Sequence, residues 1–467
     1  MNTSNRRCAG PSRRQVLRFG SVALASTALG PISAHSARGA DRTSNDPAVI
    51  FVWLPGGPPH QDTFDMKPDA PLEYRGAYSP IQTNVPGISV CEHLPKLAKC
   101  ADKYALIRSV AHKFADHGGG HKRFLTGRDP KEPTGFVNDT PMVASMAAEV
   151  LKGKKAAVPN YVCGVDGGRQ NIDTFSFGSA YLGPQSHPFF VVGDPSDKKF
   201  EIKNLSLLPG TEAKLDDRLS LLKKFDGPLH GPDLHGRAAG MTAARDRALD
   251  LITTSTARQA FDLNAESPKV RERYGLHRYG QRALLARRLV EAGSSWVTMV
   301  MENATPPGEQ MVKSHTYNWD SHAVNCHIFD DTKYKLGFLD QAISALIEDL
   351  YARGLNKRVL LVVTGEFGRT PKVEYSTGSQ TGVTQPGRDH WPQAQSILVS
   401  GACNTGVVVG STTAKAEVPK DRPLTPNDLW ATVFKHLDID HNTTSFLDGT
   451  GRPMPLLPYG DPIGELV

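Results

Sequence analysis

Three short polar clusters in the second half of the chain contain side chains that bind metal ions in proteins. They run from Asn318 to His322, from Gly365 to Pro371 and from Gly387 to Pro392. Their carboxylates and imidazoles suit a divalent ion such as zinc, manganese, calcium or iron, because deprotonated oxygens and neutral nitrogens donate lone pairs to it. A lone Asp-x-His is more often a hydrogen-bonded surface pair, but three such clusters in one half of the chain favour a metal site.

The middle cluster directly follows an unbroken apolar run, Val359 to Thr364, of the kind expected for a strand buried on both faces. Glu366 is therefore expected just beyond the carboxyl end of that strand, where open α/β sheets bind ligands. Since a glutamate after a strand is usually a solvated loop residue, this prediction depends on the other two clusters lying close by.

A fourth segment, His117-Gly118-Gly119-Gly120-His121, is preceded by His112 and Asp116. Imidazoles ligate metals, act as acids or bases near neutral pH, and attack phosphorus directly. Glycines let the backbone approach a ligand closely and aim its N–H groups at an anion. The alternative interpretation is a glycine-rich surface loop without a chemical role.

The amino-terminal residues have the pattern of a twin-arginine export signal. Arg13 and Arg14 lie in the run Ser12 to Arg18, and a weakly apolar segment rich in Ala, Ser and Gly follows. We expect a signal peptide over residues 1–40, the twin-arginine translocase as a partner during export, and a periplasmic or otherwise exported protein. A basic tail before an ordinary helix is the alternative.

The charge of the chain resides in this amino-terminal segment. The whole sequence has 54 basic and 48 acidic residues; residues 1–42 contain seven of the former and one of the latter, which leaves 47 of each. A neutral mature protein gives no reason to expect a nucleic-acid partner. Beyond the signal no stretch of about 18 apolar residues occurs, so we expect no stable membrane insertion.

Strand-like and helix-like patterns alternate along the chain, which predicts an α/β fold with a largely parallel sheet and helices on both faces. The expected strands are 49–54, 104–110, 295–301, 359–364, 396–400 and 406–409, and the expected helices are 140–151, 282–292 and 335–353. We predict one domain over residues 45–467. It carries a mainly helical insertion around 200–282, where the sequence is charged and poor in strand formers.

Several motifs together carry a family resemblance: Trp53 to Pro58, Asp62 to Pro68, Trp319 to His322, Gly365 to Pro371, Gly387 to Pro392, Asn427 to Trp430 and Gly451 to Pro453. They resemble the exported bacterial proteins called domain of unknown function 1501 (DUF1501), over nearly all of the chain beyond the signal. That family is similar in turn to the alkaline phosphatase and sulfatase superfamily. The resemblance implies a mixed α/β sheet with one or two metal ions at the strand ends.

The resemblance also implies a set of metal ligands: the pair Asp320 and His322, the acidic residue Glu366, the final histidine His390, and either Asp62 or Asp65 as an early carboxylate. Two positions depart from the superfamily pattern. Glu366-Phe367 stands where its phosphatases and sulfatases usually have Asp-His, and Gly56-Gly57 stands where they have an Asp after the first strand. We therefore expect one bound ion rather than two.

The nucleophile is the largest departure. Leu125-Thr126-Gly127 resembles the end of the nucleophile helix of sulfatases, and counting back places His117 where they carry the cysteine that is oxidised to formylglycine. Neither that cysteine nor the serine of the phosphatases is present. The resemblance implies that His117 points toward Asp320 and Glu366, with His121 one helical turn further along.

Two functional hypotheses from different classes follow. The first is an exported metal-dependent hydrolase of sulfate or phosphate esters, acting on a small molecule or a polysaccharide. In it, His117 and His121 are the catalytic candidates, and Arg369 or Arg388 stabilises developing negative charge. Either arginine has a structural ion pair as its alternative role. The second hypothesis is a catalytically silent relative that keeps the metal and binds polysaccharide or a partner protein.

Overall fold

The computed structural model describes residues 46–154, 156–167, 176–202 and 255–467, together with residues 205, 217, 220 and 221. The expected signal, residues 1–40, and much of the expected insertion around 200–282 lie outside these residues. Helices α9 (Ser255–Phe261) and α10 (Pro268–Tyr274) lie in the described part of that region. In the described chain, no helix is long and apolar enough to span a bilayer.

An eight-stranded sheet in the order β14-β4-β13-β8-β1-β7-β5-β6 forms the centre of the described chain. Its strands are β1 (Ala48–Trp53), β4 (Tyr104–Val110), β5 (Tyr161–Val165), β6 (Phe189–Val192), β7 (Trp296–Val300), β8 (Val359–Thr364), β13 (Gln395–Gly401) and β14 (Val408–Val409). β13 runs antiparallel to both of its neighbours, β4 and β8, whereas the other pairs are parallel. The sheet is therefore mixed and mostly parallel, as the sequence predicts.

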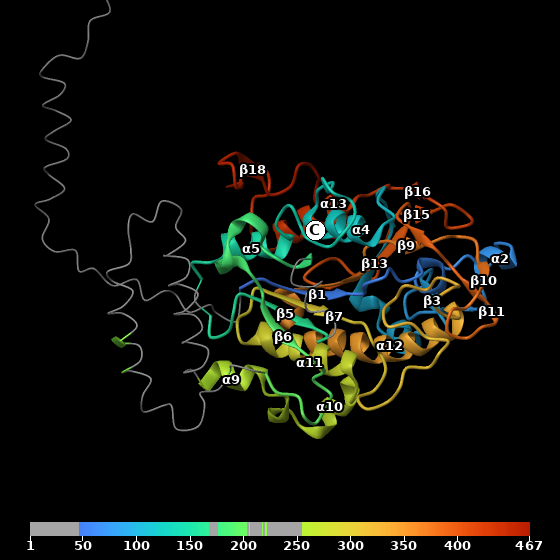
Figure 1. The fold of residues 1–467 in the computed structure, drawn as a ribbon, viewed down its shortest axis with the longest axis horizontal. Helices are drawn as coiled ribbons and strands as arrows, with labels where there is room; N and C mark the ends of the chain where they lie inside the picture. The colour runs from blue at the N-terminus through green and yellow to red at the C-terminus, as the bar shows by residue number, and fades with distance from the viewer. Residues whose placement is uncertain are drawn as a thin grey trace, which may run out of the picture. The chain divides into compact units, whose positions relative to one another are not determined.

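Helices cover both faces of this sheet (Figure 1). One face packs against α11 (Arg278–Glu291) and α12 (Ile328–Ala352), and the other against α4 (His117–Thr126), α5 (Val143–Val150) and α13 (Pro426–His436). Strand β1 shows why both layers are needed. Ile50 and Val52 belong to the core on the α12 side, while Val49 and Phe51 belong to the core on the α4 side. A strand that is apolar on both faces requires a helix layer on each.

The expected strands and helices are all observed, β4 and β8 with the expected boundaries and the others with shifted ones. Helix α12 begins at Ile328 rather than Lys335, because the His327 side chain accepts a hydrogen bond from the Asp330 N–H and caps the first turn. Strands β5 and β6 were not predicted. Gly164 interrupts the apolar pattern of β5, and a Cβ at that position would lie 2.4 Å from the Met299 sulfur on the neighbouring strand. The glycine thus reflects close packing between strands.

Candidate metal centre

Glu366 lies just beyond the carboxyl end of β8, and its side chain is fully buried. The loop after the adjacent strand β1 contacts the Glu366 side chain: the Gly56 N–H donates a hydrogen bond to Glu366 Oε1 at 2.8 Å. Gly56 has a φ of 105°, and a Cβ there would lie 2.5 Å from the Asp320 backbone nitrogen. Only glycine therefore lets the loop that carries Asp320 pack against the end of β1.

Helix α4 presents two histidines to Glu366. Its first residue, His117, places Nδ1 2.9 Å from Glu366 Oε1, and His121, one turn later on the same side, places Nε2 3.3 Å from the same oxygen. The other ring nitrogen of His117, Nε2, lies 3.3 Å from Asp320 Oδ1. His117 thus faces both carboxylates, in the orientation that the resemblance implied.

The three glycines of α4 serve packing rather than anion binding. The Asp116 side chain caps the helix by accepting from the N–H groups of Gly118 and Gly119, which are therefore not free for a ligand. A Cβ on Gly120 would lie 2.8 Å from the Phe367 ring. Since the segment is a buried helix, the surface-loop interpretation and the expected anion-binding role are both corrected.

Asp320, His322 and His390 converge on one point from two separate clusters of the sequence. The Nε2 atoms of the two histidines are 2.9 Å apart, and they lie 2.9 Å and 3.0 Å from Asp320 Oδ1. Ligand atoms at about 2.1 Å from one ion stand about 3 Å apart in octahedral and about 3.4 Å apart in tetrahedral coordination. The observed spacing suits metal ligands.

The remaining ring nitrogens fix which tautomer each histidine adopts. His322 Nδ1 contacts Asp389 Oδ1, and His390 Nδ1 lies 2.6 Å from the Ala115 carbonyl oxygen. Because both partners are acceptors, both Nδ1 atoms carry the proton and both Nε2 atoms keep a lone pair. Metal-binding histidines in proteins are oriented in the same manner, by an acceptor on the second nitrogen.

The charges of the site are strongly coupled. Burial raises the pKa of Asp320, but its contacts with His117, His322 and His390 and the charge of Arg369 outweigh it and hold the pKa far below its usual range. Burial likewise raises the pKa of Glu366. The charge of His121 and the hydrogen bonds from both α4 histidines outweigh this effect, so the pKa of Glu366 lies well below its usual value. Both carboxylates are therefore ionised at neutral pH, as metal ligands must be.

Arg369 supports the site from inside the protein. Its guanidinium is fully buried and donates to Asp320 Oδ1 at 2.7 Å and to the Trp319 carbonyl oxygen at 3.2 Å. It also donates to the carbonyl oxygens of Gly56 and Gly57. These bonds join the loop after β1 to the loop that carries Asp320. Arg369 therefore positions Asp320 and does not extend into solvent toward a substrate.

Arg388 and the two early aspartates lie apart from this cluster. Arg388 is fully buried and donates from Nε and Nη2 to the buried carboxylate of Asp62, at 2.9 Å and 3.3 Å. Asp65 pairs with Lys67 at 2.9 Å and accepts from Thr412. Asp62 and Asp65 thus belong to neither candidate ligand group of the described chain, and the alternative of a structural ion pair applies to Arg388.

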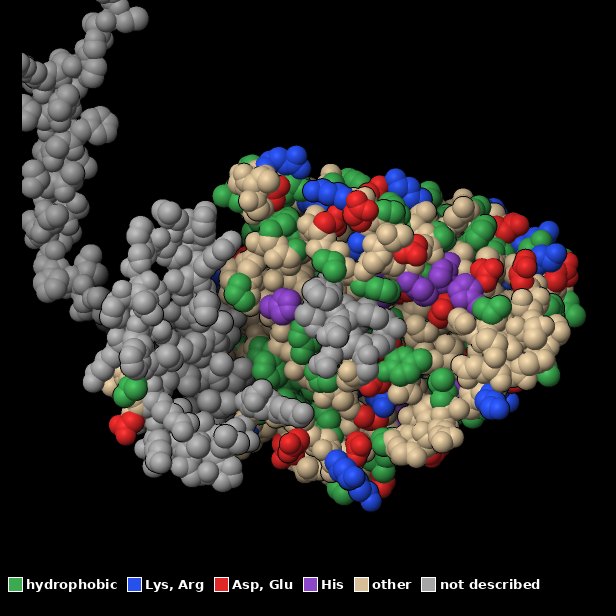
Figure 2. Space-filling model, in the orientation of Figure 1, with side chains coloured by type: hydrophobic (Ala, Val, Ile, Leu, Met, Phe, Trp, Pro, Cys, Tyr) green, Lys and Arg blue, Asp and Glu red, His purple; other side chains and the backbone are tan. Residues whose placement is uncertain are grey.

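Two groups of side chains in the described chain could hold a metal ion: His117, His121 and Glu366, and His117, Asp320 and His390. The first group is mostly buried. The second reaches the surface, with 26% of the His117 side chain and 17% of the His390 side chain exposed. In Figure 2, histidine side chains gather at the surface beside acidic ones in the region of β9 (Gly368–Arg369). The site therefore has a buried side and an open side.

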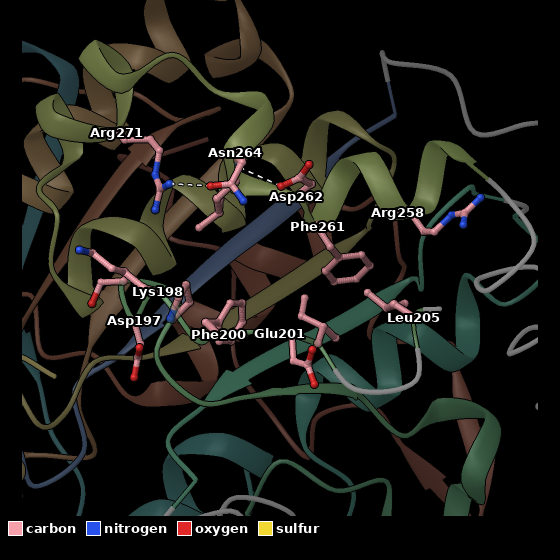
Figure 3. A pocket seen from close by; sticks show the side chains of 14 residues that line it. Asp197, Lys198, Phe200, Glu201, Leu205, Arg258, Phe261, Asp262, Asn264 and Arg271 are labelled. Atoms are coloured by element: carbon pink, nitrogen blue, oxygen red, sulfur yellow. Dashed lines mark hydrogen bonds between the residues drawn. The ribbon is translucent and has the colours of Figure 1, made fainter. Parts of the chain in front are cut away.

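A cavity of about 470 Å³ lies elsewhere, between residues 195–205 and 258–271 (Figure 3). It contains none of the residues of the two groups. Residues 203–204 and 206–216, which adjoin its lining in the sequence, are outside the described chain. The candidate metal centre is therefore separate from this cavity.

Three contributors to the site had no specific role predicted from the sequence. They are Asp389, which contacts His322; Ala115, whose carbonyl contacts His390; and His112, whose Nε2 lies 2.6 Å from the Glu366 carbonyl oxygen. Asp389 was visible as the acidic neighbour of His390. The two backbone carbonyls have no sequence signal, because any residue type supplies one.

Comparisons with known proteins place the chain in a family. A search of curated proteins gives no match. Similar solved structures include the lipoteichoic acid synthase LtaP from Listeria monocytogenes (10% identity, TM-score 0.35, 91% of this chain and 77% of that chain). They also include a phosphonate monoester hydrolase from Silicibacter pomeroyi (12%, 0.34, 85% and 74%) and alkaline phosphatase from the Antarctic bacterium TAB5 (11%, 0.34, 84% and 99%). The model of the family described as "Protein of unknown function (DUF1501)" matches residues 46–467, and the chain belongs to this family.

Proposed function

We propose that this protein is an exported, metal-dependent hydrolase of sulfate or phosphate esters. The contact between the Nε2 atoms of His322 and His390, 2.9 Å apart beside Asp320, carries the proposal. With both Nδ1–H groups donated to acceptors, two nitrogen lone pairs and a carboxylate point toward one position. A divalent cation stabilises that arrangement, whereas two neutral imidazoles alone repel each other.

A bound divalent ion would polarise the ester and lower the pKa of a water molecule beside it. The chain supplies the ligands and keeps one side of them open: 21% of the His322 side chain and 18% of the Asp320 side chain are exposed. An ester of a small molecule or a polysaccharide can approach from this side. Hydrolysis adds the oxygen of water to sulfur or phosphorus, breaks the bond to the alcohol oxygen, and transfers a proton from the water to that alcohol.

One observation favours the second candidate, a catalytically silent metal-binding relative. The side chains that contact the carboxylates of Asp320 and Glu366 in the described chain are histidines, an arginine and an asparagine, with no serine, threonine or cysteine among them. A hydrolase built on this site therefore depends on water, or on an α4 histidine, as the attacking group.

Metal analysis and an activity screen separate these possibilities. The mature protein, loaded with zinc or manganese, is assayed against aryl sulfate and aryl phosphate esters, with and without a chelator. We expect turnover that the chelator abolishes, and its loss in His322→Ala but not in His93→Ala, a histidine that packs against Tyr78 outside the site. Bound metal without turnover of either ester class would favour the silent relative, and absence of bound metal would exclude both.

A further inference from the structure

We propose that the chain binds a neutral sugar ring in a cavity at the carboxyl end of β7, and that its ester substrate is therefore a saccharide. The cavity has a volume of about 260 Å³, and Arg278, Asn303 and Tyr317 line it together with the turn from Pro306 to Glu309. It shares no lining residue with the cavity of Figure 3. The inference rests on the proposed function and names the alcohol part of the ester that this function hydrolyses.

The cavity and the metal centre are joined by one loop, between β7 and α12. Asn303 follows β7, and Tyr317 stands three residues before Asp320 in the same loop. Because successive Cα atoms are about 3.8 Å apart, the Cα atoms of Tyr317 and Asp320 are separated by at most about 11 Å. An oligosaccharide of a few units can span this distance with its ester group at the metal ion.

The residues between the cavity and Asp320 are held in place. The Lys335 side chain is 1% exposed and donates to the Asn318 carbonyl oxygen. The indole nitrogen of Trp319 donates to the Met301 carbonyl oxygen at 2.9 Å. These bonds hold the cavity and the metal ligands at a fixed separation, which helps to position a substrate that occupies both.

A buried network around Asp166, the residue after β5, orders the polar part of the lining. Asp166 Oδ2 lies 3.0 Å from Arg278 Nη1 and accepts from the Asn303 side chain at 3.4 Å, and the Tyr317 hydroxyl also bonds to this carboxylate. Asn303 has a φ of 47°, and its N–H donates to the Tyr317 carbonyl oxygen at 2.5 Å. Left-handed backbone at a residue other than glycine is uncommon and clusters at ligand sites.

The turn from Pro306 to Glu309 is a second preformed part of the lining. The Glu309 N–H donates to the Pro306 carbonyl oxygen at 3.1 Å, and Gly308 has a φ of 85°. Proline at the second position and glycine at the third are the preferred residues of a type II turn. Because the proline rings restrict the backbone before any ligand arrives, little entropy is lost on binding.

The charges around the cavity favour a neutral ligand over an anionic one. Two guanidinium groups and three carboxylates lie largely buried here, those of Arg278, Arg282, Asp166, Asp194 and Glu302. Glu309 adds a fourth carboxylate to the lining itself. An excess of negative formal charge repels sulfate, phosphate and uronate groups. The anionic ester therefore belongs at the metal centre, and an uncharged part of the substrate belongs in the cavity.

The polar groups of the lining match the hydroxyl groups of a sugar. The Arg278 side chain is 9% exposed, and within the described chain its Nη2 makes no hydrogen bond. Burial and the neighbouring carboxylates raise the pKa of Tyr317, so its hydroxyl stays protonated. With the Thr305 hydroxyl and the Glu309 carboxylate, these groups supply donors and acceptors. A volume of about 260 Å³ holds roughly nine water molecules at about 30 Å³ each, which is room for one six-membered ring.

Sugar binding by the wild type tests the inference without reference to turnover. A chelator first removes metal from the mature protein, so that a carboxylate of a probe has no ion to bind. The methyl glycosides of glucose, galactose and mannose and of their uronic acids are then titrated and followed by NMR. We expect at least one neutral glycoside to bind with a millimolar Kd, and its uronate to bind about tenfold more weakly. Binding of none of the three neutral glycosides, or equal or tighter binding of the uronate, would overturn the inference.

A cavity-filling variant locates the bound sugar. Thr305→Trp places an indole in the cavity and keeps Arg278, Asn303 and Tyr317. Thr443→Trp is the matched control, because Thr443 is exposed and lies outside the cavity lining. We expect Thr305→Trp to lose sugar binding, Thr443→Trp to keep it, and both to bind zinc as the wild type does. Circular dichroism establishes that both are folded, and sugar binding retained by Thr305→Trp would overturn the inference.

Kinetics separate a failure of this inference from a failure of the proposed function. In the zinc-loaded protein, Thr305→Trp should raise KM for a sulfated oligosaccharide while turnover of an aryl sulfate stays at the wild-type value. Equal effects on the two substrates would overturn the inference and leave the proposed function intact. Sugar binding that Thr305→Trp abolishes, in a protein that hydrolyses no ester, would support the cavity as a sugar site and contradict the proposed function.

Discussion

Asp320 binds most of its partners through one oxygen. Oδ1 accepts from Arg369 at 2.7 Å and lies within 3.3 Å of His117, His322 and His390. In the described chain it is the one carboxylate that pairs with the buried guanidinium of Arg369. Asp320 thus has two tasks, because it holds an ion in the proposed site and also balances the charge of a buried arginine.

Replacing Asp320 should therefore cost stability as well as metal. Asp320→Asn keeps the shape of the side chain but leaves Arg369 buried without a counter-charge, a change that costs about 3 kcal/mol or more. Urea unfolding of the metal-free protein measures this. The control is Asp389→Asn, whose carboxylate is 62% exposed and should contribute less than about 1 kcal/mol. Equal losses in the two variants would contradict the role given to Asp320.

Arg388 provides the converse case of a buried ion pair outside the metal site. Besides Asp62, its guanidinium donates to the carbonyl oxygens of Thr370 and Tyr74, at 3.0 Å and 2.8 Å. Lysine cannot reproduce this planar set of bonds. We expect Arg388→Lys to destabilise the protein by about 3 kcal/mol while the metal content of the folded variant stays at the wild-type value. Loss of metal at unchanged stability would instead place Arg388 in the site.

The difference between Asp320 and Asp62 shows how far single residues can be predicted from the sequence. Both are acidic residues that the family resemblance implied as metal ligands. The histidine two residues after Asp320 distinguished a ligand cluster, whereas the resemblance offered Asp62 only as one of two acidic residues, Asp62 or Asp65, that follow the first strand. Arg388, the partner of Asp62, is 326 residues away in the sequence. Long-range pairing of this kind is decided by tertiary packing, which no local pattern reports.

At the scale of elements, helix α4 is positioned by its glycines. Gly120 faces Phe367, whose ring is 1% exposed and has little room to move. Alanine at this position improves helix propensity by about 1 kcal/mol, but a Cβ 2.8 Å from the ring must displace either Phe367 or α4. The neighbouring Glu366 side chain moves with them. The packing clash should therefore outweigh the gain in propensity.

We expect Gly120→Ala to lower the free energy of unfolding by about 1–3 kcal/mol and to weaken metal binding. Gly337→Ala is the matched control, because Gly337 lies on an exposed position inside α12 and a Cβ there meets nothing within 4 Å. That variant should be more stable than the wild type by up to about 1 kcal/mol. Thermal unfolding and zinc titration measure both effects, and a stabilised Gly120→Ala with normal zinc affinity would contradict this account of α4.

The elements themselves were largely predictable. Buried strands such as β8 are continuous apolar runs, and long helices such as α12 repeat their apolar residues every three or four positions. The antiparallel direction of β13 was not predictable, because a buried strand has the same composition in either direction. The small two-stranded hairpins were not predicted either. One of them pairs β9 with β12 (His390–Trp391) and places Arg369 opposite His390. They are too short to show a period.

At the scale of the whole molecule, export is a proposal that the sequence alone supports. Replacing Arg13 and Arg14 by Lys preserves the charge but removes the guanidinium pair that the twin-arginine translocase reads. We expect the double variant to accumulate as the precursor in the cytoplasm, which cell fractionation detects. Replacement of Arg6 and Arg7 by Lys is the control and should leave export unchanged. Normal export of the Arg13, Arg14 double variant would contradict the assignment of a twin-arginine signal.

The stability of the whole fold should fall in mild acid, and His60 should account for part of the loss. This residue is 1% exposed, and burial lowers its pKa from 6.5 to about 4, against the opposing effects of Asp65 and of the bond to the Ala416 carbonyl oxygen. Between these values the unfolded chain binds a proton that the folded chain does not. The contribution of His60 to stability is therefore constant above pH 6.5 and declines as the pH falls toward 4.

The lowered pKa of His60 corresponds to about 3 kcal/mol over that window. Urea unfolding at several pH values between 7 and 4.5 measures the decline. His60→Gln retains an N–H donor for the Ala416 carbonyl oxygen but does not titrate, so its stability should depend less steeply on pH even if its stability at pH 7 is lower. The difference in slope isolates His60 from the other buried histidines, which contribute equally to both proteins. Identical slopes would show that the fold admits a charged His60, in conflict with its complete burial.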